Sequence, residues 1–154
     1  MGLDHEFILL DKKNYPLDMS FKAMLKTYDT IRRGAVTLDD DLIWYMRDTL
    51  LWIPAYSEGD NTGLNLYGIT KITKNQAKYL QNIVDSWLAL FSIAPEEELN
   101  LTGCWVTDEE SEDGGYYEKL IYKKDYILQK LKAISEMSEV VTLDEGFYIL
   151  HFGI

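Results

Sequence analysis

The chain contains one cysteine and two histidines, the side chains most often used for nucleophilic catalysis and for binding transition metals. Cys104 lies in an apolar stretch between Gly103 and Trp105, which favours a buried, unreactive thiol. His5 and His151 stand near opposite ends of the chain, and neither has a second His or Cys at zinc-ligand spacing. The sequence therefore predicts no catalytic nucleophile, no metal site and no cofactor built on these residues.

His151 alternates with Leu150 and Phe152 in the last apolar stretch, so we expect its side chain to face the side opposite to theirs. We interpret it as a structural histidine, because one histidine without a placed partner supports no mechanism. An inward-facing His151 beside a carboxylate would instead favour an enzyme or small-molecule-binding protein with a pocket between sheet and helices.

The segment 108–113 reads Asp-Glu-Glu-Ser-Glu-Asp and is the densest group of ionisable side chains. It invites comparison with a calcium-binding loop. If Glu109 is taken as the first position, Gly114 is the sixth, as such a loop requires, but the twelfth is Leu120 instead of Glu. The glycine pair 114–115 follows acids and has no lysine of a phosphate-binding loop. A solvated hairpin tip is the favoured interpretation.

Acidic residues are concentrated in the interval 94–118, which contains no Lys or Arg and is interleaved with Trp105 and two tyrosines. Carboxylates steer a cationic partner, and exposed aromatic side chains anchor it. The alternative is that these charges keep a hairpin edge from pairing with other chains. We predict a partner-binding surface formed by Asp108, Glu109, Glu110, Glu112, Asp113, Tyr116, Tyr117 and Glu118.

Composition narrows the partners that such a surface could bind. The net charge is −11, from 26 acidic and 15 basic residues, which disfavours nucleic acid and anionic membranes and permits a basic protein. A single cysteine allows no intramolecular disulfide, and no apolar segment reaches the length of a membrane span. We therefore expect a cytoplasmic protein with a basic protein partner.

The region 64–106 organises the rest of the predicted fold. Leu64 to Ile72 is predicted as a strand, a long amphipathic helix follows Thr73 and ends before Pro95, and a second strand begins at Leu99. Both predicted strands begin with the pattern Leu-Asn-Leu-x-Gly, which suggests that the chain leaves the two strands in a similar way. The remaining predicted elements are a strand at 7–10, a helix capped by Asp18, a helix starting at Thr37 or Asp39, a strand at 116–122, a helix from Asp125 and a strand at 147–152.

These elements predict a single α+β domain over residues 1–154, with a mainly helical part at 1–63. We expect an antiparallel sheet of about four to five strands with helices packed on one face. From residue 64 onward the order strand, helix, strand, strand, helix, strand is that of the ferredoxin-like fold. The alternative is a helix-plus-sheet domain with another strand order.

In size, acidity and aromatic content, and in its lack of a catalytic motif, the chain resembles the small immunity proteins that neutralise bacterial polymorphic toxins. This resemblance is one of type and rests on no diagnostic motif. It implies a cytoplasmic inhibitor, not an enzyme, that covers the basic active site of a cognate toxin domain, for example a nuclease. The alternatives are the pocket-bearing protein described above and an oligomeric structural module.

Overall fold

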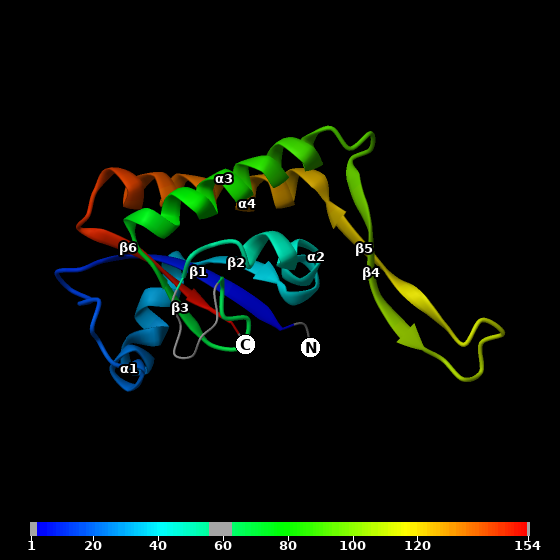
Figure 1. Ribbon diagram of the computed structural model, residues 1–154, viewed down its shortest axis with the longest axis horizontal. Coiled ribbons are helices and arrows are strands. Elements are labelled where there is room, and N and C mark those ends of the chain that lie inside the picture. Colours follow the sequence, from blue (N-terminus) through cyan, green and yellow to red (C-terminus); the bar gives the residue numbers. More distant parts are fainter. Residues whose placement is uncertain (1–2, 56–62, 154) are drawn as a thin grey trace.

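The structure is a computed structural model that describes residues 3–55 and 63–153. Its centre is a four-stranded antiparallel sheet with the strand order β2-β1-β6-β3 (Figure 1). The two inner strands lie far apart in the sequence, so the sheet is complete only when these two distant segments have paired. The strands of this sheet are β1 (Asp4–Asp11), β2 (Val36–Asp39), β3 (Ile69–Ile72) and β6 (Phe147–Phe152).

The inner strands are apolar on both faces, and helices therefore cover both. Phe7 and Ile149 face one hydrophobic core, whereas Ile8 and Leu150 face a second core on the opposite side. Three helices pack on the first core, and α1 alone packs on the second through Met24 and other residues. The helices are α1 (Phe21–Ile31), α2 (Asp40–Leu50), α3 (Lys74–Ser92) and α4 (Lys124–Leu143), and a short 3-10 turn η1 (Arg32–Gly34) follows α1.

Helix starts follow local capping signals in the sequence. Asp39 caps α2, and Thr73 forms a capping box with Gln76 at the start of α3, so both helices begin where their side chains can accept the first free N–H groups. The first helix is capped by Ser20 and not by Asp18 as predicted. A side chain two residues later in the chain thus sets its start.

The remaining strands, β4 (Glu98–Thr107) and β5 (Gly115–Lys123), form a separate two-stranded hairpin that projects from the body (Figure 1). Helix length explains the separation. The 19-residue α3 spans about 28 Å at the usual helical rise, whereas the 4-residue β3 spans about 13 Å. The helix therefore carries the chain past the end of the sheet before β4 begins, and the 20-residue α4 brings it back to β6.

The predicted α+β class with an antiparallel sheet is confirmed, and three details differ. The ferredoxin-like strand order is not found, because among the described strands β4 and β5 pair with each other and not with the four-stranded sheet, and the region before residue 64 supplies β1 and β2. The helices lie on both faces of the sheet instead of one, because β1 and β6 are apolar on both sides. The shared Leu-Asn-Leu-x-Gly pattern has two structures: in 64–68 it precedes β3, and in 99–103 it lies within β4.

In the part of the chain that the structure describes, we find no helix with both the length and the apolar character needed to cross a membrane.

Candidate functional site: the projecting hairpin

The hairpin forms because two alternating strands are joined by a loop rich in turn-forming residues. Pairing runs from Glu98 opposite Lys123 to Thr107 opposite Gly115 and is interrupted once, between Thr102 and Trp105. There two residues of β4 face one residue of β5, which is a β-bulge. Such a bulge bends and twists a ribbon, so it affects the direction in which the outer half of the hairpin points.

The loop at the tip is held together by its own hydrogen bonds. The backbone N–H of Asp108 donates to the carbonyl of Gly114 at 3.0 Å, and the N–H of Glu110 donates to the Asp108 carboxylate at 3.0 Å. Gly114 has a φ of +73°, a conformation that glycine adopts without steric cost. A Cβ at the next residue, Gly115, would lie 2.3 Å from the Val106 carbonyl oxygen. The tip is therefore ordered by local contacts, without support from the body.

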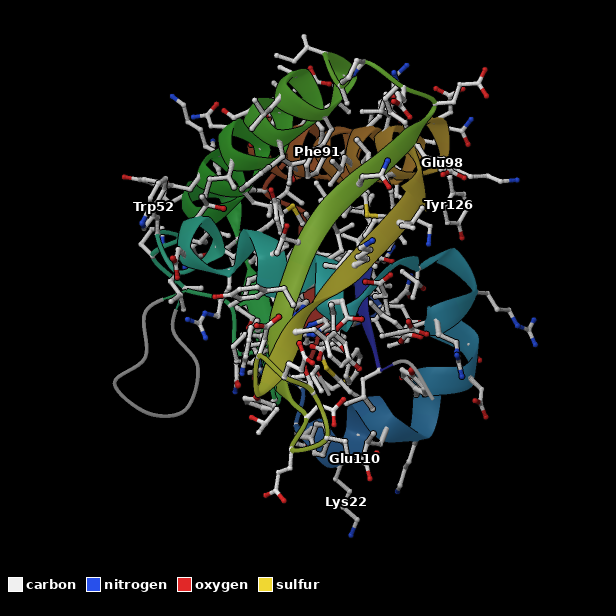
Figure 2. All side chains as sticks on the ribbon, turned by 90° about the vertical axis from the view of Figure 1, so that its right-hand side faces the viewer. Lys22, Trp52, Phe91, Glu98, Glu110 and Tyr126 are labelled. Atoms are coloured by element: carbon white, nitrogen blue, oxygen red, sulfur yellow. The ribbon has the colours of Figure 1, made fainter. Side chains whose placement is uncertain are left out.

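Most of the tip carboxylates project into solvent. Glu109, Glu110, Glu112 and Asp113 are exposed, and none of them forms an ion pair with a residue in 3–55 or 63–153. Figure 2 shows Glu110 at the far end of the hairpin and Glu98 near its base. The arrangement leaves a concentrated negative charge that a cationic partner could neutralise.

One face of the hairpin carries exposed aromatic side chains. Trp105 and Tyr117 lie opposite each other in the register, and their rings meet edge to face at 5.0 Å between centroids. They are 47% and 60% exposed, so the two rings stabilise each other while about half of each remains in solvent. Tyr116 points to the other face beside Val106 and is also half exposed. Such amphipathic rings are common anchors in protein interfaces.

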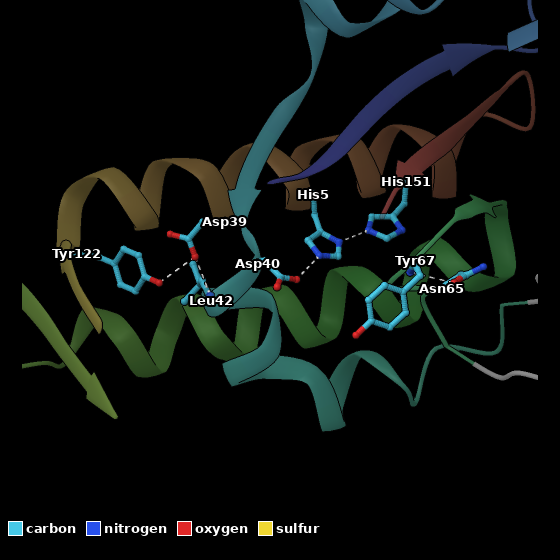
Figure 3. A network of polar contacts seen from close by, with 8 residues as sticks. All are labelled: His5, Asp39, Asp40, Leu42, Asn65, Tyr67, Tyr122 and His151. Atoms are coloured by element: carbon cyan, nitrogen blue, oxygen red, sulfur yellow. Dashed lines mark hydrogen bonds and ion pairs between the residues drawn. The ribbon is translucent and has the colours of Figure 1, made fainter. Parts of the chain in front are cut away.

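The base of the hairpin is attached firmly to the body. Leu99 and Leu120 are buried there. The Tyr122 hydroxyl donates to the Asp39 carboxylate at 2.9 Å, which ties β5 to the start of α2 (Figure 3). Burial, together with this carboxylate, raises the pKa of Tyr122, so the hydroxyl remains a donor. These contacts therefore attach the base of the hairpin to the body.

A second polar group lies inside the body, where the two histidines meet. His5 Nδ1 is 3.0 Å from His151 Nε2, and His5 Nε2 is 2.9 Å from the Asp40 carboxylate (Figure 3). The carboxylate accepts from His5 Nε2, so a neutral His5 accepts at Nδ1 and His151 Nε2 donates to it. His151 Nδ1 is then a buried lone pair without a partner among the described residues.

His151 is completely buried, and this burial, with the neighbouring His5, lowers its pKa to about 3. The ring is therefore neutral at physiological pH. As the alternation predicted, it faces the side opposite to Leu150, against Phe7. An inward-facing His151 linked to an acid is the arrangement that would favour an enzyme. Both histidine rings are fully buried in this structure.

The opposite face of the sheet holds a buried carboxylate as well. Glu6 accepts a hydrogen bond from the Tyr28 hydroxyl and pairs with Arg32 at 3.3 Å. Burial and the Glu6 carboxylate raise the pKa of Tyr28 to about 12. These contacts join β1 to α1 and η1, and we interpret them as structural because each polar group has a partner.

The structure brings together five of the predicted partner-binding residues and separates the others. The five acids 108–110, 112 and 113 all lie in the tip loop, whereas Tyr116 and Tyr117 lie on opposite faces and Glu118 is half-buried beside the bulge. Cys104 was predicted to be buried and is exposed, because it lies in the bulge of a hairpin that stands outside the four-stranded sheet and its core. Among the described residues no three His, Cys, Asp or Glu side chains form a metal-binding group.

Sequence reasoning missed two features of these sites. Trp105 was not placed in the partner-binding set, although its pairing with Tyr117 follows from the hairpin register. The contacts of His5 join it to His151, 146 positions away, and to Asp40, 35 positions away, and no local pattern could have indicated them. Comparisons with protein-family models, with curated proteins and with solved structures found no match for this chain.

Proposed function

We propose that this chain is a non-catalytic, immunity-type binding protein that neutralises a cognate basic toxin domain by covering its active site with the β4–β5 hairpin. The observation that carries the proposal is the projecting hairpin, whose tip holds five acidic residues without ion pairs among the described residues. A projecting element can enter a concave site that a flat surface could not reach.

Charge and aromatic side chains would have different parts in this binding. The tip carboxylates raise the rate of encounter with a positively charged partner, an effect that weakens as salt is added. Trp105 and Tyr117 supply rigid apolar area that loses water on binding and slows dissociation. A nuclease domain is one fitting target, because a site built to hold phosphate also accepts carboxylates.

The two other functions considered from the sequence have weaker support. An enzyme would need ionisable groups that reach a substrate, and His5 and His151 are fully enclosed. An oligomeric module would pair copies of a chain that each carry a net charge of −11, and the repulsion between such copies opposes self-association at low salt.

The test is a pulldown and thermal-shift screen against the products of neighbouring genes, at low ionic strength. We expect one basic product to bind. Binding should fall at least about tenfold in a variant with five neutral tip residues. The tip variant carries Asp108→Asn, Glu109→Gln, Glu110→Gln, Glu112→Gln and Asp113→Asn.

The matched control loses the same number of charges from exposed positions outside the hairpin and should bind as the wild type does. If no product binds, or if the tip variant and the control bind equally well, the proposal fails. The control variant carries Asp4→Asn, Asp18→Asn, Asp29→Asn, Glu136→Gln and Glu139→Gln.

A further inference from the structure

Three neighbouring hollows line the side of the body beside the hairpin. The first, of about 330 Å³, lies between α2 and α3, and it shares Leu90 with a second, of about 380 Å³, which is lined by Tyr45, the end of α3 and the residues 94–101 that lead into β4. The second hollow shares Tyr45 with a third, of about 240 Å³, which lies between α2 and the bulge of the hairpin. We call these three hollows together the α2–α3 groove. Its end therefore meets the hairpin on the side of the bulge.

The floor of the groove follows from helical periodicity. Tyr45 and Thr49 are one turn apart on α2, and Trp87 and Phe91 are one turn apart on α3, so each pair lies on one face of its helix. Tyr45 and Trp87 meet at 5.8 Å between ring centroids, Trp87 and Phe91 meet at 5.2 Å, and Trp87 Nε1 donates to Thr49 Oγ1 at 2.9 Å. The floor is thus packed and already formed.

The rim of the groove is unusually apolar for a surface. Trp52 and Leu90 line it and are 68% and 54% exposed. Figure 2, which faces the hairpin, shows Trp52 and Phe91 to one side of the hairpin and Glu98 at its base. Large apolar side chains gathered around a preformed hollow are typical of a surface that another protein covers.

The charged residues that line the groove indicate which sign of charge its occupant carries. Glu96 and Glu98 line the middle hollow, and Asp41 lines the one beside the hairpin. Among the described residues that line these three hollows there is no Lys or Arg. An occupant with apolar residues on one face and cationic residues beside it would satisfy both the rim and the acids.

We infer that the α2–α3 groove binds a basic amphipathic helix, and that this helix belongs to the partner engaged by the hairpin tip. The inference rests on the proposed function for the identity of the partner. A helix suits the groove because two helices form its floor, and their side-chain ridges match the spacing of residues on a third helix. The partner would then be held at two places, by its active site at the tip and by a helix beside α2 and α3.

The probe is a synthetic, dye-labelled peptide of about 18 residues, with Leu at positions i, i+3, i+4 and i+7 and Lys or Arg elsewhere. Its control is a scrambled peptide of the same composition and charge, which has no apolar face. We expect the probe to bind with a Kd of about 10 µM by fluorescence anisotropy and to gain helical circular dichroism on binding. The scrambled peptide should bind at least about tenfold more weakly.

Two groove variants test the site itself. Leu90→Ser and Trp52→Ala should each weaken probe binding at least about fivefold, because they remove apolar area without changing the charge of the groove, and both positions are exposed enough to leave the fold intact. Leu143→Ser is the matched control, because Leu143 is 78% exposed and ends α4, away from the hairpin. Equal binding of the scrambled peptide, or unchanged binding by both groove variants, would overturn the inference.

The tip variant described above separates this inference from the proposed function. It should still bind the helical probe within about threefold, although it binds the partner poorly. A partner that depends on the tip but not on Leu90 or Trp52 would leave the proposed function standing and overturn the groove. If the probe binds the groove but no basic partner of the protein is found, the groove stands as a peptide-binding site and the proposed function fails.

Discussion

The body and the hairpin of this protein contain similar strand-forming sequences, but the side chains of their strands are buried to different extents. In the body, β1 and β6 are covered on both faces by helices, and most of their side chains are buried. In the hairpin, β4 and β5 form a separate two-stranded sheet, and their aromatic side chains beyond the base remain largely in solvent. An alternating strand thus specifies extended backbone, and the layer above it decides whether its side chains form a core or a contact surface.

The first prediction concerns the stability of the two regions and has the largest expected effect. Leu131 on α4 is fully buried in the larger core, and Leu131→Ala should lower the free energy of unfolding by about 3 kcal/mol through lost burial and a cavity. Ile121→Ala on the exposed part of β5 should change it by less than about 0.5 kcal/mol. Urea unfolding measures both. Similar losses for the two variants would contradict the contrast between body and hairpin.

The second prediction uses the buried histidine of the body. Because burial holds the pKa of His151 at about 3, against about 6.5 in an unfolded chain, the unfolded state gains a proton first as the pH falls. This contribution to stability is complete above pH 6.5 and is lost as the pH falls from there toward 3. At pH 5 the loss should be about 2 kcal/mol.

The control for this pH effect is His151→Gln, whose amide can still donate to His5 but does not titrate. Unfolding free energies of both proteins at pH 7 and pH 5 give the comparison. The wild type should lose more stability than the variant over this interval. An identical pH dependence would mean that the folded protein binds a proton at His151 as readily as the unfolded chain does.

The third prediction tests the attachment of the hairpin to the body. Tyr122→Phe removes the hydrogen bond to Asp39 and should lower the free energy of unfolding by about 1 kcal/mol. The cost stays modest because Asp39 still accepts from the backbone N–H of Leu42 at 2.8 Å. Tyr117→Phe, at an exposed position of the same strand, is the control and should have no measurable effect. If thermal denaturation shows the same stability for the two variants, the hydrogen bond from Tyr122 to Asp39 does not stabilise the attachment of the hairpin.

The smallest expected effect on global stability is that of Trp105→Ala, at less than about 0.5 kcal/mol. The local effect should be larger, because Trp105 packs against Tyr117 and close to Gly115. Hydrogen exchange followed by mass spectrometry should show faster exchange at 106–117 and unchanged exchange in β1 and β6. Faster exchange throughout the molecule would show that hairpin and body unfold as one unit.

Much of the secondary structure could be predicted from local patterns. The apolar stripe after Thr73 predicted α3, and the alternation at 116–122 predicted β5, because side-chain periodicity and capping act over a few residues. The predicted strand at Leu64 failed over its first half, since Asn65 forms a turn by accepting from the backbone N–H of Tyr67. The same residues are compatible with an asparagine turn and with the start of a strand, and only the hydrogen bonds formed in the folded protein distinguish the two.

The sequence by itself determined the α+β class, the acidic loop between two strands and the positions of the long helices, because each depends on composition or on neighbours along the chain. Tertiary structure alone decided that His5 meets His151 across 146 positions, that Cys104 is exposed, and that the hairpin stands outside the sheet. These outcomes depend on how far α3 carries the chain relative to a short strand, and on which surfaces remain after β1 and β6 have paired. Lengths and pairings of this kind are properties of the assembled molecule, and no local stretch of residues contains them.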